Sequence, residues 1–109
     1  MRLALIASTL VLAVGTAAFA SAPAAVTLVL KNHRFTPASV TVPAGQRITV
    51  VLINQDPAGE EFDSRDLDTE EDVTPLGRTS FQIGPLKPGR YSFMGEFHAQ
   101  TAEGEVIAH

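Results

Sequence analysis

The residues that are able to bind a metal ion lie in two stretches of the chain, one strongly acidic and one ending in a histidine. The acidic stretch, Glu60 to Asp72, contains eight carboxylates and a single basic residue. The second stretch, Tyr91 to His98, places Met94, Glu96 and His98 within its last five residues. Imidazole and carboxylate together suit copper(II), and carboxylates suit iron, so the residue types indicate metal binding.

We select four candidate metal ligands from these stretches. His98 is expected to lie in a loop and is the only histidine in the second half of the chain before the terminus. Glu96 is close enough in sequence to converge on the same ion, and Glu61 comes from the acidic stretch. Met94 alternates with the aromatic residues of its expected strand, so it should face away from the core and is available as a soft ligand. The competing interpretation is that these carboxylates are only solvated charges.

Three further residues stay open as ligands. Glu70 lies in the acidic stretch, and Glu103 follows His98 by five positions. His33 falls between two expected strands, where a structural role is favoured over ligation.

The chain contains no cysteine. A blue copper centre needs a thiolate together with two imidazoles, so its charge-transfer colour and tuned potential are excluded. Any metal must be held by His, Met, Asp or Glu. No disulfide stabilises the fold, and neither Ser64 nor Ser80 has a readable His-and-acid arrangement for hydrolysis.

Short strands must position these residues. Runs rich in β-branched and apolar residues alternate with Pro/Gly turns, which predicts an all-β sandwich. The expected strands are Ala25–Lys31, Ser39–Val42, Gln46–Ile53, Arg78–Ile83, Arg90–Met94 and Gly104–Ala108.

Residues 1–20 are predicted to be a cleaved helical signal peptide. Arg2 precedes an apolar run, and Ala18-Phe19-Ala20 supplies the small residues of a cleavage site. The alternative is a membrane anchor, but the run is short for a span of about 20 residues. Residues 21–109 then form one domain, whose net charge changes from −4 to −5 when Arg2 is lost. This acidic balance argues against nucleic acid and anionic membrane as partners, and no stable membrane insertion is expected after cleavage.

The segment from Tyr91 to His98 resembles the end of the cupredoxins. In that family a Tyr-x-Phe-x-Cys-x-x-His pattern joins the last two strands, with a methionine five residues after the histidine. Here Gly95 stands where the family has cysteine, and Glu103 stands where it has methionine. The resemblance implies a cupredoxin-like Greek-key β-sandwich of about 7 strands.

Two further motifs resemble the cysteine-free, EfeO-type cupredoxin-like domains of periplasmic iron uptake. One runs from Glu61-Phe62-Asp63-Ser64 through Leu67 to Glu70, and the other runs from Leu86-Lys87-Pro88-Gly89 to His98. Glu71 and Asp72 depart from the pattern, which has a lysine and an apolar residue there. The resemblance implies a periplasmic protein that binds copper or iron, with an iron-binding protein and an inner-membrane iron permease as partners.

The sequence therefore leads to a main hypothesis and two alternatives. The hypothesis is a periplasmic copper- or iron-binding protein that supports ferrous iron oxidation or electron transfer, rather than a turnover enzyme. The first alternative is a carrier of copper or iron without redox chemistry. The second is a structural domain that has lost its metal site.

Overall fold

The structure is a computed structural model that describes residues 4, 7–11 and 24–109. The expected leader, residues 1–20, lies largely outside these residues, so its helix and its cleavage stay predictions. In the part of the chain that is described, no helix has both the length and the apolar character needed to cross a membrane.

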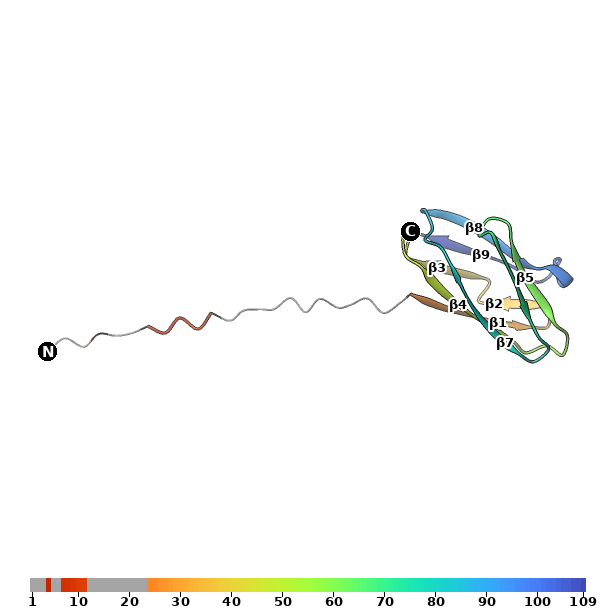
Figure 1. The fold of residues 1–109 in the computed structure, drawn as a ribbon, viewed down its shortest axis with the longest axis horizontal. Helices are drawn as coiled ribbons and strands as arrows, with labels where there is room; N and C mark the ends of the chain where they lie inside the picture. Colours follow the sequence, from red (N-terminus) through yellow and green to blue (C-terminus); the bar gives the residue numbers. More distant parts are fainter. Residues whose placement is uncertain (1–3, 5–6, 12–23) are drawn as a thin grey trace.

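The described domain is a sandwich of two sheets (Figure 1). One sheet has the strand order β2-β1-β4-β7, and the other has the order β3-β9-β8-β5-β6. The pairs β1–β4 and β3–β9 are parallel, and the remaining pairs are antiparallel. The elements are β1 (Ala25–Lys31), β2 (Arg34–Thr36), β3 (Ser39–Val42), β4 (Ile48–Asn54), β5 (Glu60–Ser64), β6 (Thr69–Val73), β7 (Arg78–Ile83), β8 (Gly89–Gly95), the 3-10 helix η1 (Glu96–His98) and β9 (Glu103–Ala108).

The predicted all-β sandwich is confirmed, with nine strands among the described residues in place of about seven. The acidic stretch accounts for much of the difference, because it forms the hairpin β5–β6. Its charges obscured a strand alternation in which Glu60, Phe62 and Ser64 are buried and the residues between them are half-buried.

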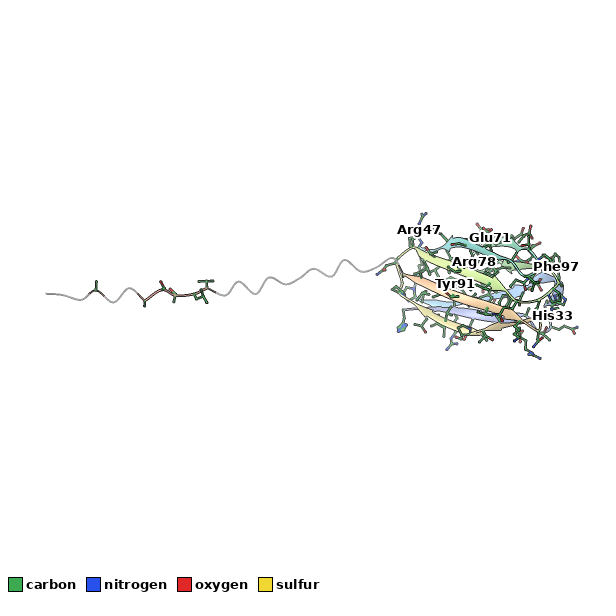
Figure 2. All side chains as sticks on the ribbon, turned by 90° about the horizontal axis from the view of Figure 1, so that it is seen from below. His33, Arg47, Glu71, Arg78, Tyr91 and Phe97 are labelled. Atoms are coloured by element: carbon green, nitrogen blue, oxygen red, sulfur yellow. The ribbon has the colours of Figure 1, made fainter. Side chains whose placement is uncertain are left out.

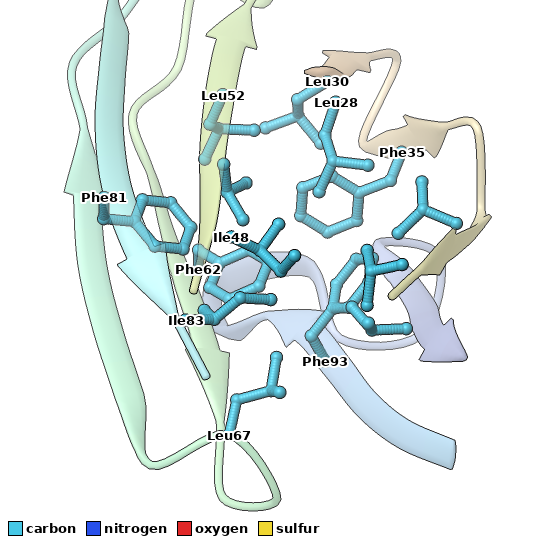
Figure 3. Close-up of a cluster of buried hydrophobic side chains, with 14 of the residues drawn as sticks. Leu28, Leu30, Phe35, Ile48, Leu52, Phe62, Leu67, Phe81, Ile83 and Phe93 are labelled. Atoms are coloured by element: carbon cyan, nitrogen blue, oxygen red, sulfur yellow. The ribbon is translucent and has the colours of Figure 1, made fainter. Parts of the chain in front are cut away.

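Aromatic side chains from both sheets fill the centre of the sandwich (Figure 3). The ring of Phe62 lies between those of Phe81 and Phe93, with centroid distances of 4.9 Å to each. Phe35 packs edge-on against Phe93 at 5.2 Å. This packing fixes β5 against β8 and thereby determines which side chains of these strands reach the end of the sandwich.

Candidate metal centre

A buried carboxylate meets a histidine at one end of the sandwich. Glu60, the first residue of β5, is only 2% exposed, because strand alternation turns it to the same side as Phe62. Its Oε2 lies 2.7 Å from Nδ1 of His98. Its Oε1 accepts the backbone N–H groups of Phe97 at 2.8 Å and Glu61 at 3.0 Å. Both carboxylate oxygens are therefore held in fixed positions next to an imidazole.

Gly95, the last residue of β8, makes room for this carboxylate. A Cβ atom at position 95 would lie 2.7 Å from Cδ of Glu60 and 2.9 Å from its Oε2. The same atom would lie 2.9 Å from Cβ of Ala102. The Glu60 carboxylate thus borders the space that any side chain at position 95 would need.

The ring of His33 covers His98. The two imidazole centroids are 3.6 Å apart and their planes are inclined by 12°. His33 and Asn32 form the turn between β1 and β2, and both have positive φ angles, 57° and 51°. Figure 2 shows His33 and Phe97 at the same end of the sandwich.

A second buried carboxylate holds that turn. Asp56 is 5% exposed and accepts the N–H groups of Asn32 at 2.7 Å and His33 at 2.9 Å. Burial opposes its ionisation, but these N–H groups outweigh burial and hold the pKa of the Asp56 carboxyl below its usual value. The N–H of Asp56 in turn donates to Oδ1 of Asn54, the last residue of β4. The side chains of Asn54, Asp56 and His33 thus link the end of β4 to the His98 ring.

A further group of acidic side chains lies on the outer face of β5 and β6. Ligand atoms of Glu61, Asp63 and Glu70 all lie within 4.8 Å of one another. Glu61 also shares a hydrogen bond with Glu96, and this bond, together with partial burial and neighbouring charges, raises the pKa of Glu61 to about 7. Like charges also face each other across the strands, in the pairs Asp63–Glu70 and Glu61–Asp72. A bound cation would relieve this repulsion.

Met94 lies on the same outer face, 41% exposed and opposite Asp63 in the register of β5 and β8. On its other side it is paired with Glu103 of β9. A groove of about 640 Å³ runs beside Met94, but neither Glu60 nor His98 lines it.

The four predicted ligands are therefore found in two places. Glu61 and Glu96 meet on the outer face, Met94 lies farther along that face, and His98 turns to the end of the sandwich. Among the described residues, the acidic group on the outer face is the only set of three His or acidic ligands within 4.8 Å. Ligation by the predicted four stays a prediction.

Sequence reasoning missed Glu60, the partner of His98. The signal was present in the parity of β5, since Glu60 and the core residue Phe62 are two positions apart. The stack of His33 on His98 had no comparable signal, because it joins residues 65 positions apart through the tertiary fold.

The donor atoms at the end of the sandwich are one imidazole nitrogen and one carboxylate oxygen, without a thiolate. This set suits copper(II) of the non-blue kind and does not suit a blue centre. The outer-face group is made of oxygen donors alone and suits a harder ion such as iron. When bound, copper would supply one-electron chemistry, while Glu60 and His98 would hold it.

A two-sheet Greek-key sandwich with a histidine after its penultimate strand defines a cupredoxin-like domain. The family model for the cupredoxin-like domain matches residues 3–108, and the chain belongs to this family. Among curated proteins, the uncharacterized protein RP394 of Rickettsia prowazekii (strain Madrid E) is 39% identical over 84 residues, which are 77% of this chain and 67% of the relative.

Solved structures share the fold at low sequence identity. Auracyanin A, a "blue" copper protein from Chloroflexus aurantiacus, has a TM-score of 0.70 at 12% identity, covering 81% of this chain and 100% of that one. The metal-binding domain of the Streptococcus pneumoniae D39 Cu(I)-exporting P-type ATPase CopA, solved with Cu(I), has a TM-score of 0.69 at 13% identity, covering 78% and 84%. The purple cupredoxin of Nitrosopumilus maritimus has a TM-score of 0.60 at 17% identity, covering 76% and 98%. The finer assignment to the EfeO-type domains stays a prediction.

Proposed function

We propose that this protein is a periplasmic metal-binding protein in which Glu60 and His98 would hold copper(II). The observation that supports this most directly is the position of the Glu60 carboxylate. It lies 2.7 Å from His98 and within 2.9 Å of the point where a Cβ of residue 95 would be. In the cupredoxins that position is the cysteine, so a fixed carboxylate takes over the place of the thiolate.

The arrangement favours binding over a merely structural role. A carboxylate and an imidazole 2.7 Å apart share a proton in the metal-free protein. Glu60 and His98 would release this proton to solvent on holding a metal ion, because both donor atoms bind a metal in their deprotonated form. Copper is named as the ion because several structural neighbours are copper proteins and because the donor set suits copper(II).

The iron-related part of the proposal concerns the outer face. The carboxylates of Glu61, Asp63 and Glu70 attract Fe(II) to the outer face of β5 and β6, and the proposed copper ligands lie at the end of the sandwich. Copper, when held by Glu60 and His98, would supply a one-electron acceptor for Fe(II), which would become Fe(III), and a periplasmic electron acceptor would take up the electron from the copper. In this role the protein supports high-affinity iron uptake together with an iron-binding protein and an inner-membrane iron permease. Its location rests on the predicted leader.

Copper binding is tested by titration calorimetry and electron paramagnetic resonance on the metal-free protein. We expect a dissociation constant for Cu(II) below about 10 μM, which corresponds to roughly −7 kcal/mol. His98→Ala and Glu60→Gln should each weaken binding at least tenfold. His109→Ala, which removes an imidazole after the end of β9, is the matched control and should leave binding unchanged. Equal affinity of the His98→Ala variant and the unmodified protein would refute the site.

The redox role needs a separate experiment. Copper-loaded protein is mixed anaerobically with Fe(II), and loss of the Cu(II) signal is followed in time. We expect reduction in the unmodified protein and slower reduction when Asp63→Asn and Glu70→Gln remove charge from the outer face. If Cu(II) is not reduced, the electron-transfer role fails, and the protein is a carrier.

A further inference from the structure

We propose that His33 is a positioning residue that fixes the imidazole of His98 for metal binding and is not itself a ligand. This inference rests on the proposed copper site of Glu60 and His98. Its basis is the stack of the two rings, with centroids 3.6 Å apart and planes 12° from parallel.

The stacked geometry prevents both histidines from binding one ion. An imidazole nitrogen binds a metal in the plane of its own ring, at about 2.0–2.1 Å for an ion such as zinc. The ring planes of His33 and His98 are nearly parallel and are separated by stacking contact. A single ion cannot lie in both planes, so His33 can share a metal with His98 only if the stack is broken.

The backbone of the turn that contains His33 is held in place by hydrogen bonds. A non-glycine residue at φ 57° is uncommon, and a second one at φ 51° precedes it. Asp56 compensates by accepting the N–H groups of both turn residues, at 2.7 and 2.9 Å. Nδ1 of His33 also lies 3.5 Å from Oδ2 of Asp56, which makes an ion pair when the imidazole is protonated. The backbone of His33, from which the ring projects over His98, is thus restrained by one buried carboxylate.

The ring of His98 has few other restraints. The carbonyl of His98 accepts the N–H groups of Thr101 at 3.1 Å and Ala102 at 2.8 Å, which holds the backbone but not the ring. The side chain is 30% exposed. Glu60 fixes only the Nδ1 edge of the ring. Stacking against His33 removes the remaining freedom of the His98 ring to rotate. Nδ1 of His98 is therefore already oriented before a metal binds. Ordering one such side chain on binding corresponds to about three- to tenfold in affinity.

The test replaces the ring of His33 while keeping the turn. His33→Asn removes the ring, and asparagine tolerates positive φ, so the turn should persist. His33→Phe keeps a flat ring that stacks but has no nitrogen to bind a metal. Amide spectra of both variants verify the fold before metal is added.

We expect His33→Asn to weaken Cu(II) binding about three- to tenfold and His33→Phe to bind within about twofold of the unmodified protein. Nitrogen hyperfine structure in the Cu(II) spectrum should indicate one imidazole in all three proteins. In the metal-free protein, ring-current shifts of the His98 protons should be lost in His33→Asn and retained in His33→Phe.

The outcomes separate the two proposals. Equal copper affinity of the unmodified protein and His33→Asn would overturn the positioning role and leave the copper site intact. Two imidazoles in the unmodified protein, falling to one in both variants, would show that His33 is a ligand and would also overturn it. No copper binding by the unmodified protein would refute the proposed function and, with it, the inference built on it.

Discussion

Replacing Glu60 tests whether its carboxylate supports the fold as well as a metal. Glu60→Ala removes the acceptor of the Phe97 and Glu61 N–H groups and the partner of His98. Each buried donor left without an acceptor costs about 1–3 kcal/mol. Removal of a buried charge recovers part of this cost, because its desolvation penalty disappears. We expect a net loss of about 2–4 kcal/mol in the free energy of unfolding of the metal-free protein.

Urea unfolding measures this loss. For a small domain the urea m-value is about 1 kcal/mol/M, so the midpoint should fall by about 2–4 M with the slope unchanged. Glu60→Gln is the matched control, since its amide oxygen can accept both backbone N–H groups while its amide nitrogen faces His98. We expect the Gln variant to retain most of the stability and still to lose copper affinity. If Glu60→Ala unfolds at the same urea concentration as the unmodified protein, the carboxylate does not stabilise the end of the sandwich.

Three further predictions concern Gly95 and Glu61. Gly95→Ala should lower the free energy of unfolding by about 1–3 kcal/mol in urea titrations, because the new Cβ crowds Ala102 and displaces Glu60. Glu61, whose pKa is raised to about 7 by its hydrogen bond with Glu96, binds its proton more tightly in the folded than in the unfolded state. The free energy of unfolding of the metal-free protein should therefore fall as the pH rises from about 4.5 to about 7. Urea titrations at pH 5 and 7.5 should show a smaller fall for Glu61→Gln than for the unmodified protein. An equal fall in both proteins would contradict the raised pKa of Glu61. The double variant Gly95→Cys with Glu60→His should give an intense Cu(II) charge-transfer band in visible absorption, since it restores a thiolate and a second imidazole. An equally intense band from Gly95→Cys alone would refute the idea that the carboxylate excludes a side chain at position 95.

Most of the fold was predictable from the sequence because β-strands leave a local signal. Ala25–Lys31, Ser39–Val42 and Arg78–Ile83 begin and end at the predicted residues. The hairpin β5–β6 was not predicted, because its strand signal is an alternation of buried and charged residues within an acidic run. Burial of a glutamate such as Glu60 is rare in proteins unless it is paired, so composition alone argues against it.

The site was less predictable, since it depends on contacts between residues distant in sequence. His98 was predicted as a ligand from its motif, and the exposure of Met94 followed from strand parity. Which glutamate reaches His98 depends on the end of β5 meeting the loop after β8, and this is a property of the two sheets packed together. The sequence pattern does not show this contact, and it led to Glu61 as the predicted metal ligand. In the structure, Glu61 shares a hydrogen bond with Glu96 on the outer face.

Gly95, at the position where the cupredoxins have cysteine, and the buried carboxylate of Glu60 share one small region of the structure. A side chain at position 95 and the carboxylate of Glu60 compete for the same space, since a Cβ there would lie 2.7 Å from Cδ of Glu60. A domain that merely lost its thiolate would be left with a cavity at this place. Here the space is filled by a carboxylate whose two oxygens contact three nitrogen atoms. A buried carboxylate must have partners such as these, and the proposed metal ligation by Glu60 and His98 would give this arrangement a use.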